Sequence, residues 1–372
     1  MSRLFAALML LALCAVAAPA RAFTPESGWW WNPDEPGYGV SIEIQDDFMF
    51  LAIYTYDSVG SPRNSKWYVA QGFVTGNDLF RAQFTSDPSV TNVFYTSRNG
   101  TCLGCPFSQF QFDTTDNPGS IEVRFESETT ARMTVGGRVI PIERHDFWLS
   151  RTAGINPKTE LWLGEWQVVM DFINIEDYED YPFMGDVLIF DLLDTSASAD
   201  FFEGCRPEDS LVGVCDDFAL ENHDASGFYS PADGTNIIVV NDSANGWFVY
   251  EVEVGTYQFD GYMKSCPKSL TNLVTQCLDN DATYPVIPVR GWRSASRAFI
   301  EGDDNAPNAQ GGRTKAASGR SERGVATEAR LVTAKAGARP AEPRARPDAA
   351  ATAALLDAAV SRLNDKSRRA AR

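Results

Sequence analysis

Hydrophobic and polar residues alternate in short runs along the first part of the chain. Residues 40–45 read Val-Ser-Ile-Glu-Ile-Gln, and a period of two is typical of a β-strand with one buried face. Residues 48–56 are apolar at both parities, which predicts a strand that is covered on both sides. Similar runs continue to about residue 148, and Gly136-Gly137 favours a tight hairpin turn. We predict strands over residues 40–45, 48–56, 67–74, 79–85, 107–113, 120–127, 130–135 and 138–148.

The pattern returns in weaker form from about residue 158 to residue 299. It begins with a tryptophan-rich stretch at 161–166, continues with a buried run at 186–193, and alternates again over 248–254. Many short strands joined by turns are typical of sandwiches and barrels. The sequence therefore predicts an all-β chain with two antiparallel up-and-down β-barrel or sandwich-like domains. We place the first over residues 23–152 and the second, a diverged β-domain, over 158–299. A single fold of two sheets is the alternative.

Residues 1–22 have the features of a signal peptide. Arg3 precedes an apolar run, and Ala20-Arg21-Ala22 supplies the small residues of a cleavage site. The run is short for a membrane span. Lipidation at Cys14 is the alternative to cleavage after Ala22. We expect the mature chain to be exported to the periplasm, the outer surface or the extracellular space.

Residues 300–372 form an Ala- and Arg-rich tail with almost no aromatic residues, which predicts disorder over most of its length. A helix is expected over 348–364, because Leu355, Ala359 and Leu363, flanked by Leu356 and Val360, form an apolar stripe at helical spacing. Such a helix either docks on a partner or on the acidic body of the chain itself. The alternative is a tail with no fixed role.

Six cysteines remain once the signal peptide is removed, and they fall into three pairs that are close in sequence. An even number of cysteines in an exported chain favours disulfides over metal or redox chemistry. The alternative for the first pair, a thioredoxin-like redox motif, requires a helix start in a βαβ unit, whereas this pair lies in a loop. We predict local bridges, which join Cys102 to Cys105, Cys205 to Cys215 and Cys266 to Cys277.

The charge is distributed unevenly along the chain. Residues 23–300 carry 16 basic and 41 acidic side chains, whereas residues 301–372 carry 14 basic and 9 acidic ones. A body this acidic repels nucleic acid and anionic lipid. The partners that fit are cations, basic proteins and neutral molecules such as glycans, although solubility after export is a simpler explanation. We expect no nucleic-acid partner, no membrane span and no cofactor.

The N-terminal motif carries the clearest resemblance in the chain. Residues 28–39 read Gly-Trp-Trp-Trp-Asn-Pro-Asp-Glu-Pro-Gly-Tyr-Gly, and Tyr54-Thr-Tyr-Asp57, Gly60 and Trp67-Tyr68 follow. This pattern resembles the uncharacterised secreted bacterial β-proteins that carry a GxWWNPxExGxG repeat, and it covers residues 28–148. The resemblance implies a β fold and export. It implies no activity, because none is established for that family.

The aromatic residues around this motif are the best candidates for a binding site. They could form a stacking platform at a barrel mouth for a sugar ring or an apolar ligand, or they could be core residues. Of the three consecutive tryptophans, we expect two to plug one end of the barrel and one to face outward. The tentative ligand-binding residues are Trp29, Trp31, Tyr54, Tyr56, Trp67 and Tyr68.

No catalytic or metal-binding motif accompanies these aromatic residues. The chain has only two histidines, His145 and His223, and neither a G-x-S-x-G nor an H-E-x-x-H sequence. The acidic loop from Asp171 to Asp186 lacks the spacing of a calcium site and is expected to be solvated. We therefore expect a non-catalytic binding or interaction module. A cell-envelope structural protein and a secreted hydrolase are the alternatives.

Overall fold

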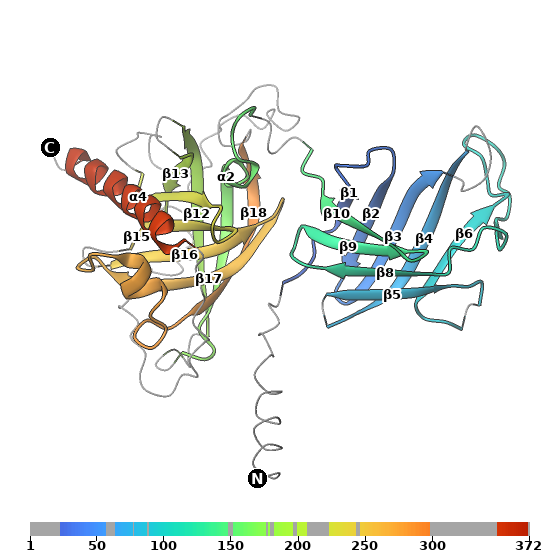
Figure 1. The fold of residues 1–372 in the computed structure, drawn as a ribbon, viewed down its shortest axis with the longest axis horizontal. Coiled ribbons are helices and arrows are strands. Elements are labelled where there is room, and N and C mark those ends of the chain that lie inside the picture. The colour runs from blue at the N-terminus through green and yellow to red at the C-terminus, as the bar shows by residue number, and fades with distance from the viewer. Residues whose placement is uncertain are drawn as a thin grey trace, which may run out of the picture. The chain divides into compact units, whose positions relative to one another are not determined.

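A computed structural model of the chain describes residues 23–56, 64–76, 78–87, 89–147, 152–175, 178, 182–195, 199–206, 223–242, 246–297 and 348–370. The chain divides between His145 and Asp146 into two compact units, each built around its own β-barrel (Figure 1). The predicted signal peptide and most of the predicted tail lie outside the described residues. The prediction of an all-β chain with two antiparallel barrels is confirmed.

Eight strands of the first unit form a closed ring in which β10 returns to pair with β1. The ring runs in the order β1, β2, β3, β4, β5, β8, β9 and β10. β4 and β5 pair over only two residues, and β6 lies between them further along, antiparallel to β4 and parallel to β5. The strands are β1 (Gly28–Trp31), β2 (Gly39–Gln45), β3 (Phe48–Tyr56), β4 (Ser65–Thr75), β5 (Leu79–Phe84), β6 (Val93–Arg98), β7 (Gln111–Phe112), β8 (Ser120–Phe125), β9 (Thr130–Val135) and β10 (Arg138–Arg144).

The hairpin of β6 and β7 was only partly predicted from the sequence. No strand was expected over 93–98, and the strand expected over 107–113 contains only two residues. Residues 99–110 between the two strands are exposed throughout. We call residues 93–112 the arm. The arm is an insertion between β5 and β8 of an otherwise consecutive ring.

The interior of the first barrel is filled by the inward-facing residues of its strands. Trp30 is completely buried among them, while Trp29 and Trp31, one residue to either side, face outward and are partly exposed. The expectation that two of the three tryptophans plug the barrel was therefore wrong. In a strand, residues two apart share a face, so the flanking tryptophans must point together, away from the core.

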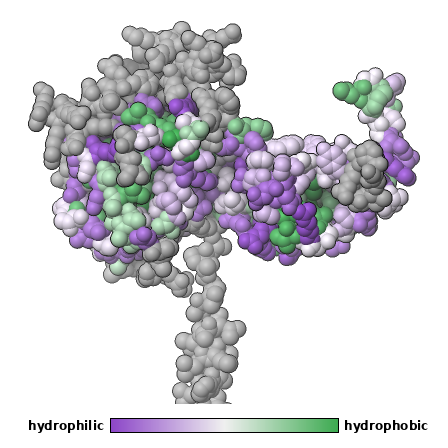
Figure 2. Space-filling model, turned by 45° about the horizontal axis from the view of Figure 1, so that its top comes forward, coloured by the Kyte–Doolittle hydropathy of each residue, from purple (hydrophilic) through white to green (hydrophobic). Residues whose placement is uncertain are grey.

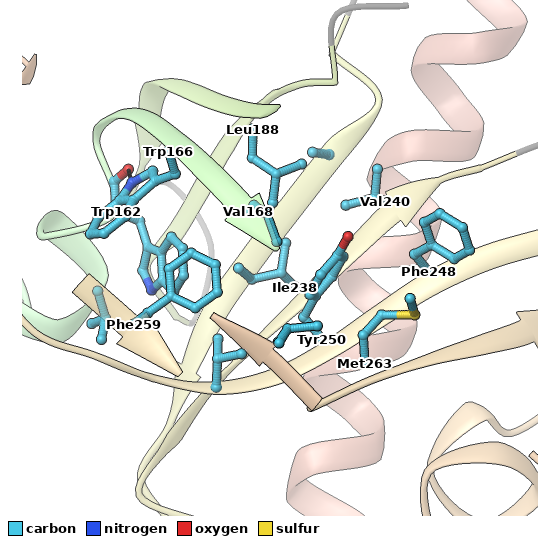
Figure 3. Close-up of a cluster of buried hydrophobic side chains, with 14 of the residues drawn as sticks. Trp162, Trp166, Val168, Leu188, Ile238, Val240, Phe248, Tyr250, Phe259 and Met263 are labelled. Carbon is cyan, nitrogen blue, oxygen red and sulfur yellow. Dashed lines mark hydrogen bonds between the residues drawn. The ribbon is translucent and has the colours of Figure 1, made fainter. Parts of the chain in front are cut away.

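The second unit is a closed barrel of eight strands that pair strictly in chain order, with β18 returning to β11. Large aromatic and aliphatic side chains fill its interior, where Trp162 and Trp166 lie beside Phe259 (Figure 3). Its elements are α2 (Pro157–Glu160), β11 (Gly164–Asp171), β12 (Phe183–Asp194), β13 (Phe201–Cys205), β14 (Ala225–Ser230), β15 (Thr235–Asn241), β16 (Gly246–Val254), β17 (Gln258–Pro267), η3 (Val274–Leu278), β18 (Ile287–Ser296) and α4 (Ala349–Ala370).

The C-terminal helix α4 packs on the outside of this second barrel, against β14, β15 and η3 (Figure 1). Asp348 caps its start by accepting a hydrogen bond from the backbone N–H of Ala351 (3.0 Å). Leu356, Ala359 and Leu363 are almost completely buried in a cluster of outward-facing residues of the barrel. The helix predicted over 348–364 therefore forms and docks on the chain's own body. The stripe centres on Leu356, because Leu355 is only partly buried.

The first barrel closes where β10 pairs with β1, and we call this junction the seam. Three residues form its contacts, namely Gly28, Trp30 and Arg144. Arg144, at the end of β10, reaches across β1, and its guanidinium donates hydrogen bonds to backbone carbonyl oxygens. A Cβ atom at Gly28 would lie 2.2 Å from this guanidinium, and the φ of 135° at Gly28 also favours glycine. The indole N–H of Trp30 donates to the carbonyl oxygen of Glu26 (3.0 Å). The acceptors for the guanidinium are Ser27 (3.0 Å), Trp29 (3.3 Å) and His145.

The second barrel closes in the same way, with Gly164, Trp166 and Arg293 in the equivalent places. Gly164 has a φ of 134°, and a Cβ there would lie 2.8 Å from the guanidinium of Arg293. The indole N–H of Trp166 donates to the carbonyl oxygen of Trp162 (2.9 Å), four residues earlier as in the first barrel. The guanidinium lies 4.2 Å from the Trp166 ring centroid. It donates to the carbonyl oxygens of Thr256 (3.0 Å), Leu163 (2.7 Å) and Leu161.

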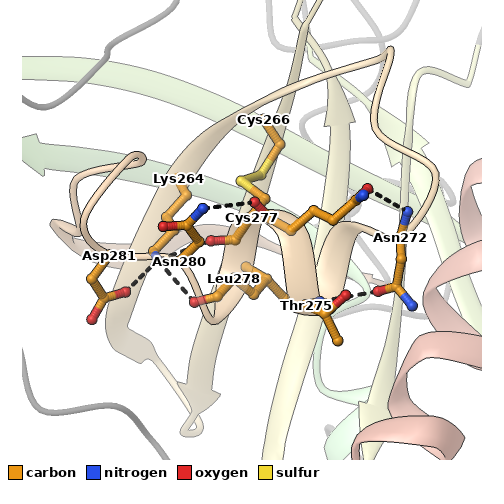
Figure 4. The surroundings of a disulfide bond; sticks show 9 residues. Lys264, Cys266, Asn272, Thr275, Cys277, Leu278, Asn280 and Asp281 are labelled. Carbon is orange, nitrogen blue, oxygen red and sulfur yellow. Dashed lines mark hydrogen bonds and ion pairs between the residues drawn. A yellow bond between two sulfur atoms is a disulfide. The ribbon is translucent and has the colours of Figure 1, made fainter.

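Two of the three predicted disulfides are confirmed. Cys102 bridges to Cys105 at the end of the arm, and Cys266 on β17 bridges to Cys277 in η3 (Figure 4). Beside the second bridge the Lys264 ammonium donates to the carbonyl oxygens of Cys277 (3.1 Å) and Leu278 (2.8 Å). Cys205 is also disulfide-bonded, but its predicted partner Cys215 lies outside the described residues.

Candidate functional site

Most of the predicted ligand-binding residues lie together on the outer surface of the first barrel. Tyr54, Tyr56 and Trp67 are 46%, 51% and 48% exposed. Trp29 and Trp31 are partly exposed on the same side of β1. We call the outward aromatic residues of β1, β3 and β4 the aromatic face. Tyr68 is the exception, because it points inward and is 9% exposed.

Strand pairing explains how these side chains meet. Tyr54 lies directly opposite Trp67 across β3 and β4. The ring of Trp29 lies over Gly39 on β2, where a Cβ atom would lie 2.6 Å from the indole, and it stacks on Tyr54 with ring centroids 5.2 Å apart. Because Gly39 has no side chain, the ring of Trp29 on β1 can lie over β2 and reach Tyr54 on β3.

We expected the aromatic platform to line a barrel mouth, and it does not. It lies on the outer surface of the first barrel. Residues 48, 50, 52, 54 and 56 of β3 point outward, and residues 49, 51 and 53 point into the core. Three further rings on the outside, Phe48, Phe50 and Phe73, are 37%, 39% and 47% exposed. The sequence did predict an apolar outer side for β3, but it predicted that this side is covered. In the described part of the chain these rings are exposed.

The arm continues the aromatic face beyond β4. Tyr95 on β6 lies opposite Val69 on β4, and its ring meets Phe112 edge to face at 5.2 Å between centroids. Phe112 in turn meets Phe110 at 5.4 Å. The sequence analysis placed Phe110 and Phe112 on a strand over 107–113, but it did not name them or Tyr95 as site residues. The tip of the arm also exposes Leu103 and Phe107, at 106% and 83%.

The other side of the same barrel has a different surface chemistry. The outward positions of β5, β8 and β9 carry ion pairs, in which Arg81 contacts Glu122 (2.7 Å), Arg124 contacts Asp78 (3.1 Å) and Arg132 contacts Glu126 (2.7 Å). Figure 2 shows hydrophobic patches set among hydrophilic residues on one face of the molecule. Exposed aromatic residues gathered on one side of a barrel mark an interaction surface more than scattered ones do.

A polar cluster closes the end of β4 next to the aromatic face. The Lys66 ammonium contacts Asp116 (2.8 Å) and Asp113 (3.4 Å), and the Tyr68 hydroxyl donates to Asp116 (2.6 Å). Burial lowers the pKa of Lys66, but the hydrogen bonds and charges of the two aspartates outweigh it and raise that pKa. Hydrogen bonds from Thr115, followed by Lys66, lower the pKa of Asp113 to about 2. The cluster pairs one ammonium group with two carboxylates, which leaves a net charge of −1.

The two histidines lie in different units of the chain. His145 follows β10, and its ring packs against Trp31 at 5.0 Å. His223 is buried between Asp191 (2.8 Å) and Glu203 (3.8 Å). Glu203 also contacts Arg362 of α4 (3.0 Å), so His223 belongs to a buried ionic network under the helix.

The acidic segment from Asp171 to Asp186 is only partly described. Asp186 is not solvated, since its side chain is 8% exposed and pairs with Arg206 (2.9 Å), which also contacts Asp242 (3.2 Å). Burial raises the pKa of Asp186, and Arg206 opposes this effect. The other acidic residues of this segment, at positions 176, 177, 179 and 180, lie outside the described residues. Within the described ranges, no three His, Cys, Asp or Glu side chains are grouped to hold a metal ion.

Two further findings bear on the placement and relationships of the chain. No helix within the described residues has the length and apolar character to cross a membrane. Comparisons with protein-family models, with curated proteins and with solved structures found nothing that matches the chain.

Proposed function

We propose that this chain is an exported binding module, and that the aromatic face of its first barrel contacts the ligand. Export is supported by the bridges at Cys102–Cys105 and Cys266–Cys277, since structural disulfides persist in oxidising compartments. The resemblance of residues 28–148 to secreted β-proteins agrees with export. It transfers no activity.

A contrast between two strands carries the proposal. Both β3 and β15 are apolar on both faces. On β15 the outward residues Ile237 and Val239 are fully buried, because α4 lies over them. On β3 the outward residues Phe48, Phe50 and Tyr54 are 37–46% exposed. A strand with the composition of a covered strand and an exposed outer face is the signature of a surface that a ligand covers.

Neutral glycans are the ligand class that fits this surface best. The exposed or partly exposed rings include those of Trp29, Tyr54 and Trp67, which offer flat faces with a polar edge. The acidic body disfavours anionic polymers, since like charges repel. Inward-facing residues occupy both barrel interiors, which argues against a small ligand enclosed there. A purely structural envelope protein has no need of half-exposed tryptophans on one side of a barrel.

A matched pair of tryptophan substitutions tests the proposal. Trp67→Ala removes a ring of the aromatic face, whereas Trp292→Ala removes a ring of similar exposure, 46%, from the outside of the second barrel. Each substitution should cost less than about 1 kcal/mol of stability, because the rings are half exposed. Trp30→Ala, in the core, should cost about 3–5 kcal/mol.

The functional measurement is sedimentation of the purified chain with insoluble neutral polysaccharides, namely cellulose, chitin, xylan and starch. We expect the wild type and Trp292→Ala to co-sediment with at least one of them, and Trp67→Ala to remain in solution. If the chain binds none of the four, or if Trp67→Ala binds as well as the wild type, the proposal is wrong. A core-like loss of stability in Trp67→Ala would show that this ring is structural.

A further inference from the structure

The outward rings of the aromatic face and of the arm follow one another across neighbouring strands, with Tyr95 on β6 opposite Val69, two residues along β4 from Trp67. Trp29 stacks on Tyr54, and Tyr54 is the cross-strand neighbour of Trp67. Beyond β4 the series continues through Tyr95, Phe112 and Phe110. We propose, on the basis of the proposed function, that this series is one extended site for a neutral glycan chain that runs across the strands, with the arm supplying its far subsites.

The length of the series indicates a polymer. The rings stand on β1, β3, β4, β6 and β7, which are neighbours in the sheet in the order β1-β2-β3-β4-β6-β7. Five steps of about 4.8 Å between adjacent strands give a path of about 24 Å along the curved sheet, which is about the length of five sugar residues. A single sugar would touch only one or two of these rings.

The convex shape of the surface leads to the same conclusion. Small ligands are held in concave sites that surround most of their area. The outside of a closed barrel is convex, and each ring of the series offers at most one free face to a ligand. A ligand therefore gains contact area here through its length.

The residues that lie between the rings have short, uncharged side chains. Gly39, Ser41, Ala52, Val69 and Ser97 lie beside the rings on the outward side of β2, β3, β4 and β6. Ala52 and Val69 are each 4% exposed, because the larger side chains around them cover them. None of the five carries a charge. A row of rings above small, uncharged residues fits a neutral chain better than an anionic one.

The arm is organised before any ligand binds. The Cys102–Cys105 bridge closes its tip. The Ser108 hydroxyl donates to the carbonyl oxygen of Asn99 (3.1 Å), and the backbone N–H of Ser108 donates to the Thr101 hydroxyl (2.7 Å). At its base the backbone N–H of Asp113 donates to the carbonyl oxygen of Thr96 (2.9 Å). Preorganisation lowers the entropy lost on binding, so Phe110 and Phe112 are already in place.

The test is a length series measured by isothermal titration calorimetry with the full mature chain. The probes are soluble β-1,4-linked oligomers of glucose and of N-acetylglucosamine, from two to six units. We expect the affinity to rise with each added unit and to level off at about five units, when the row of strands is spanned. The double variant Phe110→Ala/Phe112→Ala should lose about tenfold in affinity for the five-unit oligomer and bind the two-unit oligomer as the wild type does.

The control is Phe107→Ala, which removes an exposed ring at the tip of the same arm. It should leave the affinity for every oligomer, from two to six units, unchanged. If five units bind no more tightly than two, or if the double variant matches the wild type at every length, the extended site is refuted. The proposed function then still stands, provided that Trp67→Ala abolishes binding. If no oligomer and no insoluble polysaccharide binds, both proposals fail. Circular dichroism of each variant confirms that it is folded.

Discussion

Replacing Arg293 by methionine should destabilise the second barrel alone. The guanidinium donates three hydrogen bonds to the carbonyl oxygens of Thr256, Leu163 and Leu161, and it lies 4.2 Å from the ring centroid of Trp166. Methionine keeps most of the aliphatic stem and the volume but cannot donate a hydrogen bond. The substitution therefore isolates the polar part of the seam.

The magnitude follows from these contacts. A hydrogen bond from a charged donor contributes about 1.5–3 kcal/mol, and a cation–π contact contributes about 0.5–2 kcal/mol. Three donors on one guanidinium are not independent, so their sum is an upper limit. We expect a loss of about 3–5 kcal/mol, which corresponds to a fall of about 10 °C in the melting temperature of a domain of this size.

Differential scanning calorimetry of the full chain measures this loss. Two compact units, each with its own core, should melt in two transitions. Arg144→Met is the matched substitution at the seam of the first barrel, and it identifies which transition belongs to which barrel. A loss below about 1 kcal/mol in Arg293→Met would show that the seam contacts contribute little. An equal shift of both transitions would show that the barrels do not unfold separately.

Two further predictions concern the helix and the polar cluster. Leu356→Ala and Leu363→Ala should each destabilise the second barrel by about 2–4 kcal/mol, up to the docking energy of α4, whereas the partly buried Leu355→Ala should cost less; equal losses in calorimetry at all three positions would contradict the observed helix face. The pKa of Asp113, about 2, lies below the ordinary aspartate value near 4, so its carboxylate stabilises the first barrel above pH ~4 and loses this effect as the pH falls toward about 2. Asp113→Asn should therefore reduce the fall in melting temperature over that range, and an unchanged fall would contradict this origin.

The sequence predicted strands well where one face meets the core and the other meets water. β2, β8 and β9 alternate cleanly and lie close to their predicted positions. β15 was not predicted, although residues 237–240 are apolar at both parities as in β3; Ile237 and Val239 pack under α4, while Ile238 and Val240 pack into the barrel. A strand covered on both faces loses its period, and the covering helix begins more than a hundred residues later in the chain.

The same ambiguity explains what was missed at the candidate site. The sequence of β3 is typical of a strand that is covered on both sides. Only the structure shows that Phe48 and Phe50 remain exposed. The placement of Trp29 beside Tyr54 depends on the glycine at position 39 and on strand register, neither of which the apolar pattern encodes. The sequence did not indicate the role of the seam arginines, Arg144 and Arg293. An arginine that donates to backbone carbonyl oxygens cannot be distinguished in the sequence from an arginine on the surface.

The closure of each ring at its seam also determines how the chain can be assembled. Trp30 pairs with Arg144 in the first barrel, and Gly164 pairs with Ser296 in the second. The entry and exit of each barrel are thus adjacent strands, so the first barrel, and the second barrel together with α4, are modules that can be placed in series along a polypeptide. Modules of this kind can be duplicated or joined in new orders without opening a sheet. Because the ends meet, each barrel also has a circular order of strands, and its starting point can be moved to another turn.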